Sequence, residues 1–170
     1  MSAMRGAVVG VVCALSLAVA SPAVAGAASK HGGTKATTTT TLNQAAATPQ
    51  VTAAFVTLFN SNDKKLTNRE QLIQSASKYK SKFVKLFSST VAKANPTVAQ
   101  VTAVTFPGTA ACKAAVKVPV CAAVTYNIDT ATTGATLLAG QTGYAVYVGG
   151  KWLVSNVSFC ALAKLAGVTC

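Results

Sequence analysis

The spacing of apolar residues changes near Pro96. Before this residue, large apolar side chains recur every three or four positions, which is the spacing of one buried face of a helix. We expect a first helix that is capped by Thr48. A second helix is expected to begin at a capping box formed by Thr67 and Glu70, and a third to run from Ser77 to Ala94.

After Pro96, apolar and polar residues alternate, which predicts strands. The expected strands are Val98–Phe106, Ala122–Asp129, Ala135–Leu138, Thr142–Val148 and Lys151–Phe159. A short helical tail is expected over Cys160–Ala166. Three N-terminal helices followed by an antiparallel meander indicate an α+β fold, with the helices packed on one side of the sheet.

The last two strands form a hairpin whose two faces are both apolar. Gly149 and Gly150 suit a two-residue turn, which pairs Tyr147 with Trp152. One face is then formed by Tyr144, Val146, Val148, Leu153, Val157 and Phe159, and the other by Ala145, Tyr147, Trp152 and Val154. An antiparallel sheet usually leaves one face to water, so this hairpin needs cover on both faces.

The helices can cover one face of the hairpin. The other face requires a strongly curved sheet, a partner subunit in a homodimer, or a binding surface. A curved sheet wrapped round the helices would enclose a conical pocket for a small apolar ligand. The residues expected to line this pocket are Phe55, Phe87, Tyr126, Tyr144 and Trp152.

Features near the C-terminus carry a resemblance to known proteins. Gly143 opens the penultimate strand, residues 150–152 read GKW at the turn, and the chain ends in SFCALAKLAG followed closely by Cys170. Together with the order of helices and strands, residues 49–170 resemble the nuclear-transport-factor-2-like (cystatin-like) superfamily. More narrowly, they resemble small secreted actinobacterial proteins related to the mycobacterial low-molecular-weight secreted antigen. The resemblance implies a curved sheet folded round helices, with a cavity, and it brings no catalytic residues.

Residues 1–25 have the three parts of a secretory signal peptide. Arg5 supplies a positive charge, the apolar run that follows is too short to span a bilayer, and residues 23–25 form an A-x-A cleavage site. We expect cleavage after Ala25, with cleavage after Ala28 as the alternative. The chain is therefore predicted to be secreted or associated with the cell envelope.

Residues 26–48 are rich in Ala and Thr and lack a hydrophobic period, so no packed core is expected there. We interpret this segment as a flexible tether, and its run of threonines at 37–41 is either bare or O-glycosylated. Residues 49–170 are long enough for one domain with one core and too short for two.

Four cysteines remain after the predicted cleavage. An even number in an exported chain indicates two disulfides, which can form in three ways. We favour Cys112–Cys121 and Cys160–Cys170, because each closes a short local loop. A zinc site is the alternative, but the chain has no C-x-x-C pair and its one histidine, His31, lies in the tether. We therefore expect no metal and no cofactor.

The chain is strongly basic, with 15 Lys and Arg, 3 Asp and Glu, and a formal net charge of +12. Four lysines of the third helix form a stripe that no acid interrupts: Lys78, Lys82, Lys85 and Lys93. The stripe is either a solvated face or a surface for a polyanion, such as an anionic component of the cell envelope. Lys outnumbers Arg by 13 to 2, and Arg rather than Lys supplies bidentate recognition of phosphate, so we expect no sequence-specific binding of nucleic acid.

Few residues of the predicted domain could catalyse a reaction. It has no histidine, and its acids are Asp63, Glu70 and Asp129. The first two fall at helix ends, and Asp129 is expected to be a solvated residue at a turn, on the face opposite Tyr126. Without a histidine, neither a Ser-His-Asp set nor a Cys-His pair can form. We expect no catalytic residues.

These observations favour an exported, non-catalytic binding or structural module that holds a small apolar ligand between helices and sheet. The first alternative is a basic protein that binds an anionic envelope component through its lysine stripe. The second is a small-molecule isomerase or dehydratase, which would need Asp129 or a tyrosine to point into the cavity.

Overall fold

The computed structural model describes residues 42–88, 92–93, 95–106 and 110–170. The predicted signal peptide, most of the predicted tether and part of the expected third helix lie outside these residues. Within them, the fold mixes helices with one antiparallel sheet, so the predicted α+β class is confirmed.

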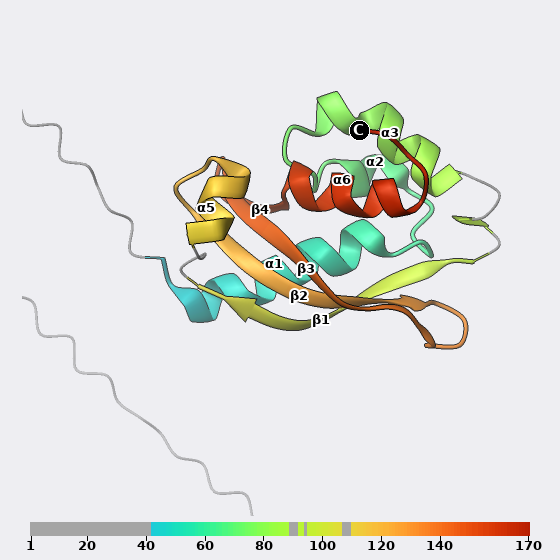
Figure 1. Cartoon of the computed structure of the whole chain (residues 1–170), viewed down its shortest axis with the longest axis horizontal. Coiled ribbons are helices and arrows are strands. Elements are labelled where there is room, and N and C mark those ends of the chain that lie inside the picture. The colour runs from blue at the N-terminus through green and yellow to red at the C-terminus, as the bar shows by residue number, and fades with distance from the viewer. Residues whose placement is uncertain (1–41, 89–91, 94, 107–109) are drawn as a thin grey trace, which may run out of the picture. The chain divides into compact units, whose positions relative to one another are not determined.

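The helices are α1 (Gln44–Phe59), α2 (Leu66–Glu70), α3 (Ala76–Ser88), α5 (Ala110–Val116) and α6 (Asn156–Leu165) (Figure 1). The strands are β1 (Thr97–Thr105), β2 (Cys121–Thr130), β3 (Thr136–Val148) and β4 (Lys151–Val154). They follow one another in the sheet in the order β1-β2-β3-β4, which is the predicted meander.

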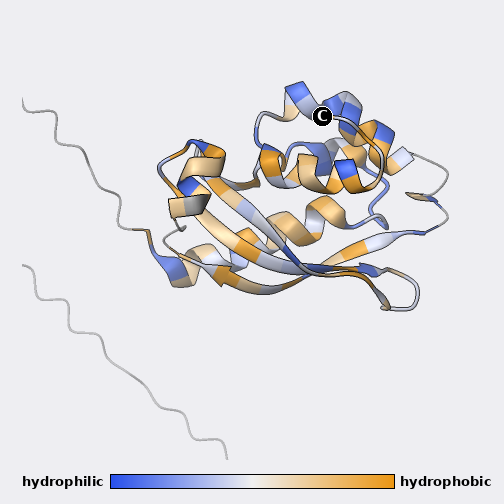
Figure 2. Cartoon of the chain, in the orientation of Figure 1, coloured by the Kyte–Doolittle hydropathy of each residue, from blue (hydrophilic) through white to orange (hydrophobic). Residues whose placement is uncertain are grey.

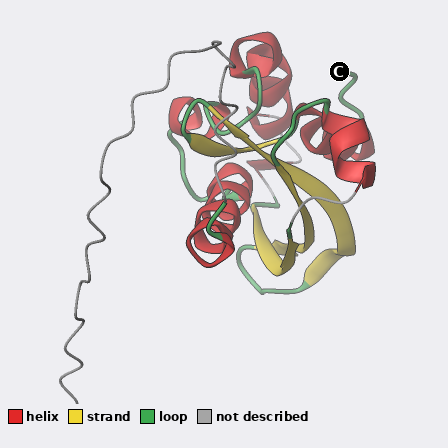
Figure 3. Cartoon of the chain, turned by 90° about the vertical axis from the view of Figure 1, so that its left-hand side faces the viewer, coloured by secondary structure: helices red, strands yellow, loops and turns green. Residues whose placement is uncertain are grey.

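The sheet curls strongly around α1 (Figure 3). Helix α1 contacts both β1 and β4, although these strands form the two opposite edges of the sheet. The register also shifts between Val101 and Ala103 in β1 and between Tyr126 and Ile128 in β2. Such irregularities bend a strand and increase its twist. The predicted strong curvature is therefore confirmed.

Helix α1 begins earlier than the sequence pattern predicts. Asn43 is its cap, and its side chain accepts a hydrogen bond from the backbone N–H of Ala46 at 3.2 Å. Thr48 lies inside the helix, so the prediction that it is the cap was wrong. The first turn is anchored by Ala47, which is 3% exposed, rather than by a large apolar residue. A hydrophobic period built from large side chains does not detect this turn.

The capping box expected at the second helix is absent. Helix α2 begins at Leu66, and no side chain caps it. Thr67 is therefore inside the helix, and Glu70 is buried at its last position. The carboxylate of Glu70 forms an ion pair with Lys80 of α3, with 3.2 Å between Oε1 and Nζ. This pair links two neighbouring helices, which a local capping motif would not do.

Strand β3 is one long strand where two short ones were expected. The two predicted segments join at Gly140, which has a φ of 60° and donates its N–H to Asn127 Oδ1 at 2.8 Å. A positive φ is readily adopted by glycine, so the strand can bend here without ending. The prediction of separate strands over 135–138 and 142–148 was wrong.

The hairpin between β3 and β4 has the predicted register. Tyr147 pairs with Trp152, and Val148 pairs with Lys151. Gly149 and Gly150 form the turn with φ values of 60° and 82°. The two-residue turn and its glycines were therefore predicted correctly from the local sequence.

Strand β4 ends at Val154, five residues before the predicted end. Ser155 caps α6, and its Oγ accepts a hydrogen bond from the N–H of Ser158 at 3.1 Å. Val157 and Phe159 therefore belong to a helix, and their assignment to a sheet face was wrong. The serine cap competes with strand formation because its side chain satisfies a backbone donor of the helix.

Each face of the hairpin is partly covered within the chain, while Tyr147 and Val148 are 37% and 43% exposed. Trp152 is 4% exposed and belongs to the core that packs around α1. On the other face, Val146 is fully buried in a separate cluster with Cys112 and Val116 of α5. Figure 1 shows α5 beside the strands at that end of the sheet. The short helix α5, which the sequence pattern did not predict, supplies the cover on this second face.

The two predicted disulfides are present. Cys112–Cys121 ties α5 to the start of β2, with 6.4 Å between the Cα atoms. Cys160–Cys170 ties α6 to the C-terminus, with 5.7 Å between the Cα atoms. Each bond therefore holds a helix that packs beside the curled sheet.

Candidate functional site

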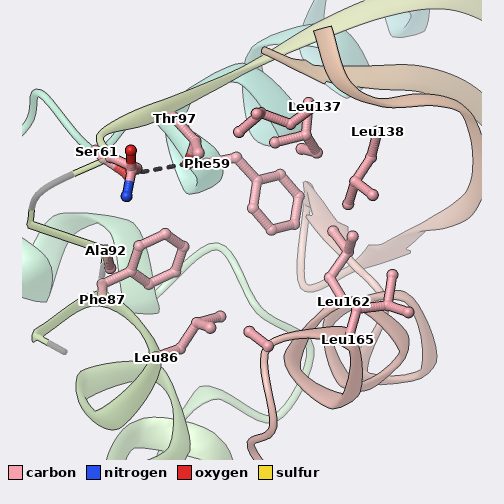
Figure 4. A pocket seen from close by; sticks show the side chains of 13 residues that line it. Phe59, Ser61, Leu86, Phe87, Ala92, Thr97, Leu137, Leu138, Leu162 and Leu165 are labelled. Atoms are coloured by element: carbon pink, nitrogen blue, oxygen red, sulfur yellow. Dashed lines mark hydrogen bonds between the residues drawn. The ribbon is translucent and has the colours of Figure 1, made fainter. Parts of the chain in front are cut away.

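An open cleft of about 440 Å³ lies where the end of α1, the C-terminal part of α3, helix α6 and the sheet meet (Figure 4). It is lined by Phe59, Ser61, Leu86, Phe87, Ala92, Asn95, Thr97, Ile128, Leu137, Leu138, Leu162, Leu165 and Ala166. Most of these side chains are apolar, and the volume falls within the roughly 300–1,000 Å³ that is usual for small-molecule sites. The cleft is the strongest candidate for a binding site among the described residues.

One end of the cleft is formed by leucines. Figure 4 shows Leu137 and Leu138 of β3 facing Leu162 and Leu165 of α6. Leu137 is 51% exposed and Leu165 is 65% exposed. Single exposed leucines are common on protein surfaces, but two on the rim of one apolar cleft form a patch that an apolar ligand would cover.

The other end of the cleft carries hydroxyl groups. The Oγ of Ser61 and the Oγ1 of Thr97 are 3.1 Å apart and share a hydrogen bond (Figure 4). The backbone N–H of Ser61 also donates to the carbonyl of Thr97 at 2.8 Å, which joins the loop after α1 to the start of β1. The two hydroxyls are therefore held in place beside the apolar lining.

A buried arginine supports the wall of the cleft. Arg69 is 1% exposed, and its Nε and Nη2 donate to the carbonyl of Leu58 at 3.0 and 2.8 Å. Its guanidinium carbon lies 4.1 Å from the ring centroid of Phe87, which lines the cleft. A cation over an aromatic face attracts the ring electrostatically. Arg69 thereby fixes the end of α1 and the position of Phe87.

The charge on Arg69 is maintained in the folded protein. Burial lowers the pKa of Arg69 to about 10, and the nearby carboxylate of Asp63 partly offsets the decrease. Arg69 was not predicted as a site residue. Its residue type could have drawn attention to it in the sequence, because it is the only arginine in a predicted domain whose other basic residues are lysines.

The structure does not bring the five predicted pocket residues together. Phe87 lines the cleft, whereas Trp152 lines a second hollow of about 390 Å³. Phe55 and Tyr126 are packed in the core with 5.0 Å between their ring centroids, and burial raises the pKa of Tyr126. Tyr144 packs against the cluster under α5. Four of the five predicted residues therefore lie outside the lining of the cleft.

The second hollow is more polar than the cleft. Its lining includes the polar side chains Gln50, Thr57, Asn68 and Lys151, beside Trp152. It lies between α1, α2 and the turn of the β3–β4 hairpin. A polar lining of this kind is well solvated without a ligand, so the first cleft is the better site for an apolar molecule.

None of the three acids in the described residues, Asp63, Glu70 and Asp129, lines the cleft. Asp129 is 8% exposed, so the expectation of a solvated residue was wrong. Its Oδ1 is buried without a hydrogen-bond partner among the described residues, yet Asp129 does not line the cleft. Across the described ranges, no three His, Cys, Asp or Glu residues are grouped so that they could hold a metal ion.

The lysine stripe is solvated on the part of α3 that is described. Lys78 and Lys85 are exposed and Lys82 is half-buried, while Lys93 is exposed in the short described segment 92–93. Helix α3 has hydrophilic and hydrophobic positions along its length (Figure 2). In the described part of the chain, Lys80 is the lysine that pairs with a carboxylate, so the charge of the stripe is not neutralised by acids.

No described helix combines the length and the apolar character needed to cross a membrane. No family model matches the chain, and no curated protein matches it.

Proposed function

We propose that this chain is an exported, non-catalytic module that binds a small apolar molecule in the cleft between α3, α6 and the sheet. The observation that carries the proposal is an open cavity of about 440 Å³ with a largely apolar lining. Two exposed leucines on its rim, Leu137 and Leu165, would lose contact with water when a ligand binds. Burying apolar surface contributes roughly 25 cal/mol per Å².

The proposal includes export and a cystatin-like cone. Two disulfides are typical of chains that fold in an oxidising compartment, which supports secretion or attachment to the cell envelope. The curled sheet with α1 inside its curve supports the resemblance to nuclear-transport-factor-2-like proteins. The predicted signal peptide and the three N-terminal helices of that fold belong to the same proposal.

Binding of a neutral fluorescent probe, N-phenyl-1-naphthylamine, tests the site. Ala166 lines the cleft and Ala53 lines the second hollow. We expect Ala166→Trp to fill the cleft and to weaken probe binding at least about tenfold, a loss of roughly 1.4 kcal/mol. Ala53→Trp is the matched control and should bind the probe as the unchanged chain does. No probe binding to the unchanged chain, or equal losses in both variants, would contradict the proposal.

A second candidate function is binding of an anionic envelope surface through α3. Lys78, Lys82 and Lys85 lie three and four positions apart on one side of the helix, without acidic partners among the described residues. Replacing all three by Gln should weaken binding to phosphatidylglycerol vesicles and reduce its salt dependence. Replacing Lys113, Lys117 and Lys151 by Gln removes the same charge elsewhere and is the control. Equal effects of the two triple variants would indicate only a general effect of net charge.

An isomerase or dehydratase has less support. Asp129, the acid that this alternative favours, does not line the cleft. Tyr126 is 1% exposed in the aromatic core, where burial raises its pKa and disfavours transfer of its proton.

A further inference from the structure

The cleft has two chemically different ends. The leucine end is formed by Leu137, Leu138, Leu162 and Leu165 (Figure 4). The hydroxyl end is formed by Ser61 and Thr97, which the same figure shows on the opposite side of Phe59. A ligand that matches both ends must itself be amphiphilic, with an apolar chain and a polar head.

The hydroxyl end can donate a hydrogen bond to a ligand. The two side chains hold one hydrogen each, and the bond between Ser61 Oγ and Thr97 Oγ1 uses one of the two. The other hydroxyl hydrogen can turn toward the cleft. A ligand oxygen that accepts hydrogen bonds therefore fits this end.

Two exposed lysines, Lys64 and Lys93, lie within four residues of Ser61 and Thr97 along the chain. The Nζ of Lys64 is 3.2 Å from the carbonyl oxygen of Ser61, and Lys64 is exposed and able to swing toward a ligand. Lys93 is also exposed, and it lies in the chain between two residues that line the cleft, Ala92 and Asn95.

The balance of charged groups near this end also favours an anion. The guanidinium of Arg69 packs behind the ring of Phe87 at 4.1 Å. The nearest acid along the chain is Asp63, whose Oδ1 accepts a hydrogen bond from the N–H of Lys65 at 2.8 Å. Asp129 also lies nearby, because it pairs with Val98 next to Thr97, whereas Glu70 is ion-paired with Lys80. The basic groups Lys64, Lys65, Arg69 and Lys93 outnumber Asp63 and Asp129, so the hydroxyl end attracts an anion rather than a cation.

We infer that the cleft takes a single-chain amphiphile with an anionic head, such as a long-chain fatty acid. Its carboxylate lies at the hydroxyl end, where Ser61 or Thr97 donates to it and Lys64 supplies a cation. Its chain passes Phe59 toward the leucine end. A cavity of about 440 Å³ suits one chain, because it is at the lower end of the roughly 300–1,000 Å³ range for ligand sites. This inference rests on the proposed function of the cleft.

Three ligands of equal chain length test the head group: hexadecanoate, hexadecan-1-ol and hexadecylamine. Each is titrated against the full chain below its aggregation concentration, by displacement of N-phenyl-1-naphthylamine. Hexadecanoate should bind about tenfold more tightly than the alcohol, because hydrogen bonds to a charged group are stronger than neutral ones. The amine should bind more weakly than the alcohol because its cation meets like charges.

Two variants locate the head group. Lys64→Gln and the double change Ser61→Ala with Thr97→Val should each lower the affinity for hexadecanoate toward that for the alcohol. Lys64→Gln should change the affinity for hexadecan-1-ol by no more than about twofold, because the alcohol carries no charge. The double change should weaken the alcohol less than hexadecanoate, because a hydrogen bond to a neutral oxygen is weaker than one to a carboxylate. Lys117→Gln, an exposed lysine outside the cleft lining, is the control and should leave the preference for hexadecanoate unchanged. A thermal unfolding curve for each variant verifies that it is folded.

The outcomes separate the two proposals. If all three ligands bind equally, or if the amine binds most tightly, the anionic head is wrong and the apolar cleft stands. If Lys64→Gln retains the full preference for hexadecanoate, the position of the head is wrong. If none of the ligands binds the unchanged chain and the probe does not bind either, both proposals are wrong.

Discussion

The aromatic core and the cleft share Phe59, yet one is filled and the other is open. On the core side, Phe59 stacks on Tyr126 with 6.0 Å between centroids and 6° between planes. On the other side it borders the cavity of about 440 Å³. The same helix and sheet therefore produce a packed interior at one place and an open cleft next to it.

The difference arises from what faces the aromatic rings. In the core, Gly143 brings β3 close to the rings, since a Cβ atom there would lie 3.0 Å from Tyr126 Cε1 and 3.2 Å from Phe55 Cε1. In the cleft, the facing residues come from β3 and α6, and Leu137 and Leu165 remain largely exposed. Close approach of the backbone closes the core, whereas the leucines of the cleft do not meet across it.

Truncating one side chain in the core and one on the rim of the cleft should give the largest difference in the free energy of unfolding. Phe55→Ala removes a fully buried ring and should lower the free energy of unfolding by about 3–5 kcal/mol. Leu165→Ala, on the exposed rim, should change it by less than about 0.5 kcal/mol. Urea denaturation of both variants measures the two values. Similar losses in both variants would show that the cleft is packed as tightly as the core.

Removal of the disulfides should separate stability from ligand binding. Replacing Cys112 and Cys121 by Ala frees α5, and should cost about 2–3 kcal/mol in stability while leaving probe binding in the cleft unchanged. Replacing Cys160 and Cys170 by Ala should cost a similar amount and also weaken probe binding, because α6 carries Leu162 and Leu165. Urea denaturation and probe titration of both double variants test this. Equal probe binding by the two double variants would contradict the expected difference between the disulfides.

The pH dependence of stability should reflect the ionisation of Tyr126, whose phenol is buried in the core. Burial raises the pKa of Tyr126 above its ordinary value of about 10, so the unfolded chain loses this proton before the folded one does. The folded state binds more protons above pH 10, and its stability therefore falls as pH rises. Between pH 10 and 11 this fall should be about 1 kcal/mol.

The variant Tyr126→Phe isolates this effect. Urea denaturation at pH 9, 10 and 11 should show a shallower decrease in stability for Tyr126→Phe than for the unchanged chain. Tyr147→Phe is the control, because Tyr147 is 37% exposed, and it should keep the full decrease. Parallel curves for the unchanged chain and Tyr126→Phe would indicate that the phenol is not protected by the core.

The features predicted correctly are governed by residues that are close in sequence. Gly149 and Gly150 determine the turn and hence the pairing of Tyr147 with Trp152. Short loops favour the disulfides Cys112–Cys121 and Cys160–Cys170. Alternation of apolar residues predicted the strands, although the end of β4 was missed because Ser155 caps a helix.

The candidate site was predicted less well. Five large aromatic residues were predicted to line a pocket, and of these Phe87 is the one that lines the cleft. Aromatic rings fill cores as readily as they line cavities, so residue type alone does not separate the two uses. Ser61 and Thr97 were missed because they are 36 positions apart in the chain and meet only through the fold.

From the sequence alone came the α+β class, the hairpin register, the two disulfides and the need to cover both faces of the hairpin. The tertiary structure decided what covers the second face, which is α5, and where the open space lies. It also determined that Arg69 is buried and that Asp129 is not solvated. The reason is physical: turns, strand alternation and short loops depend on neighbouring residues, whereas burial and cavities depend on how side chains from distant segments fill the space between them.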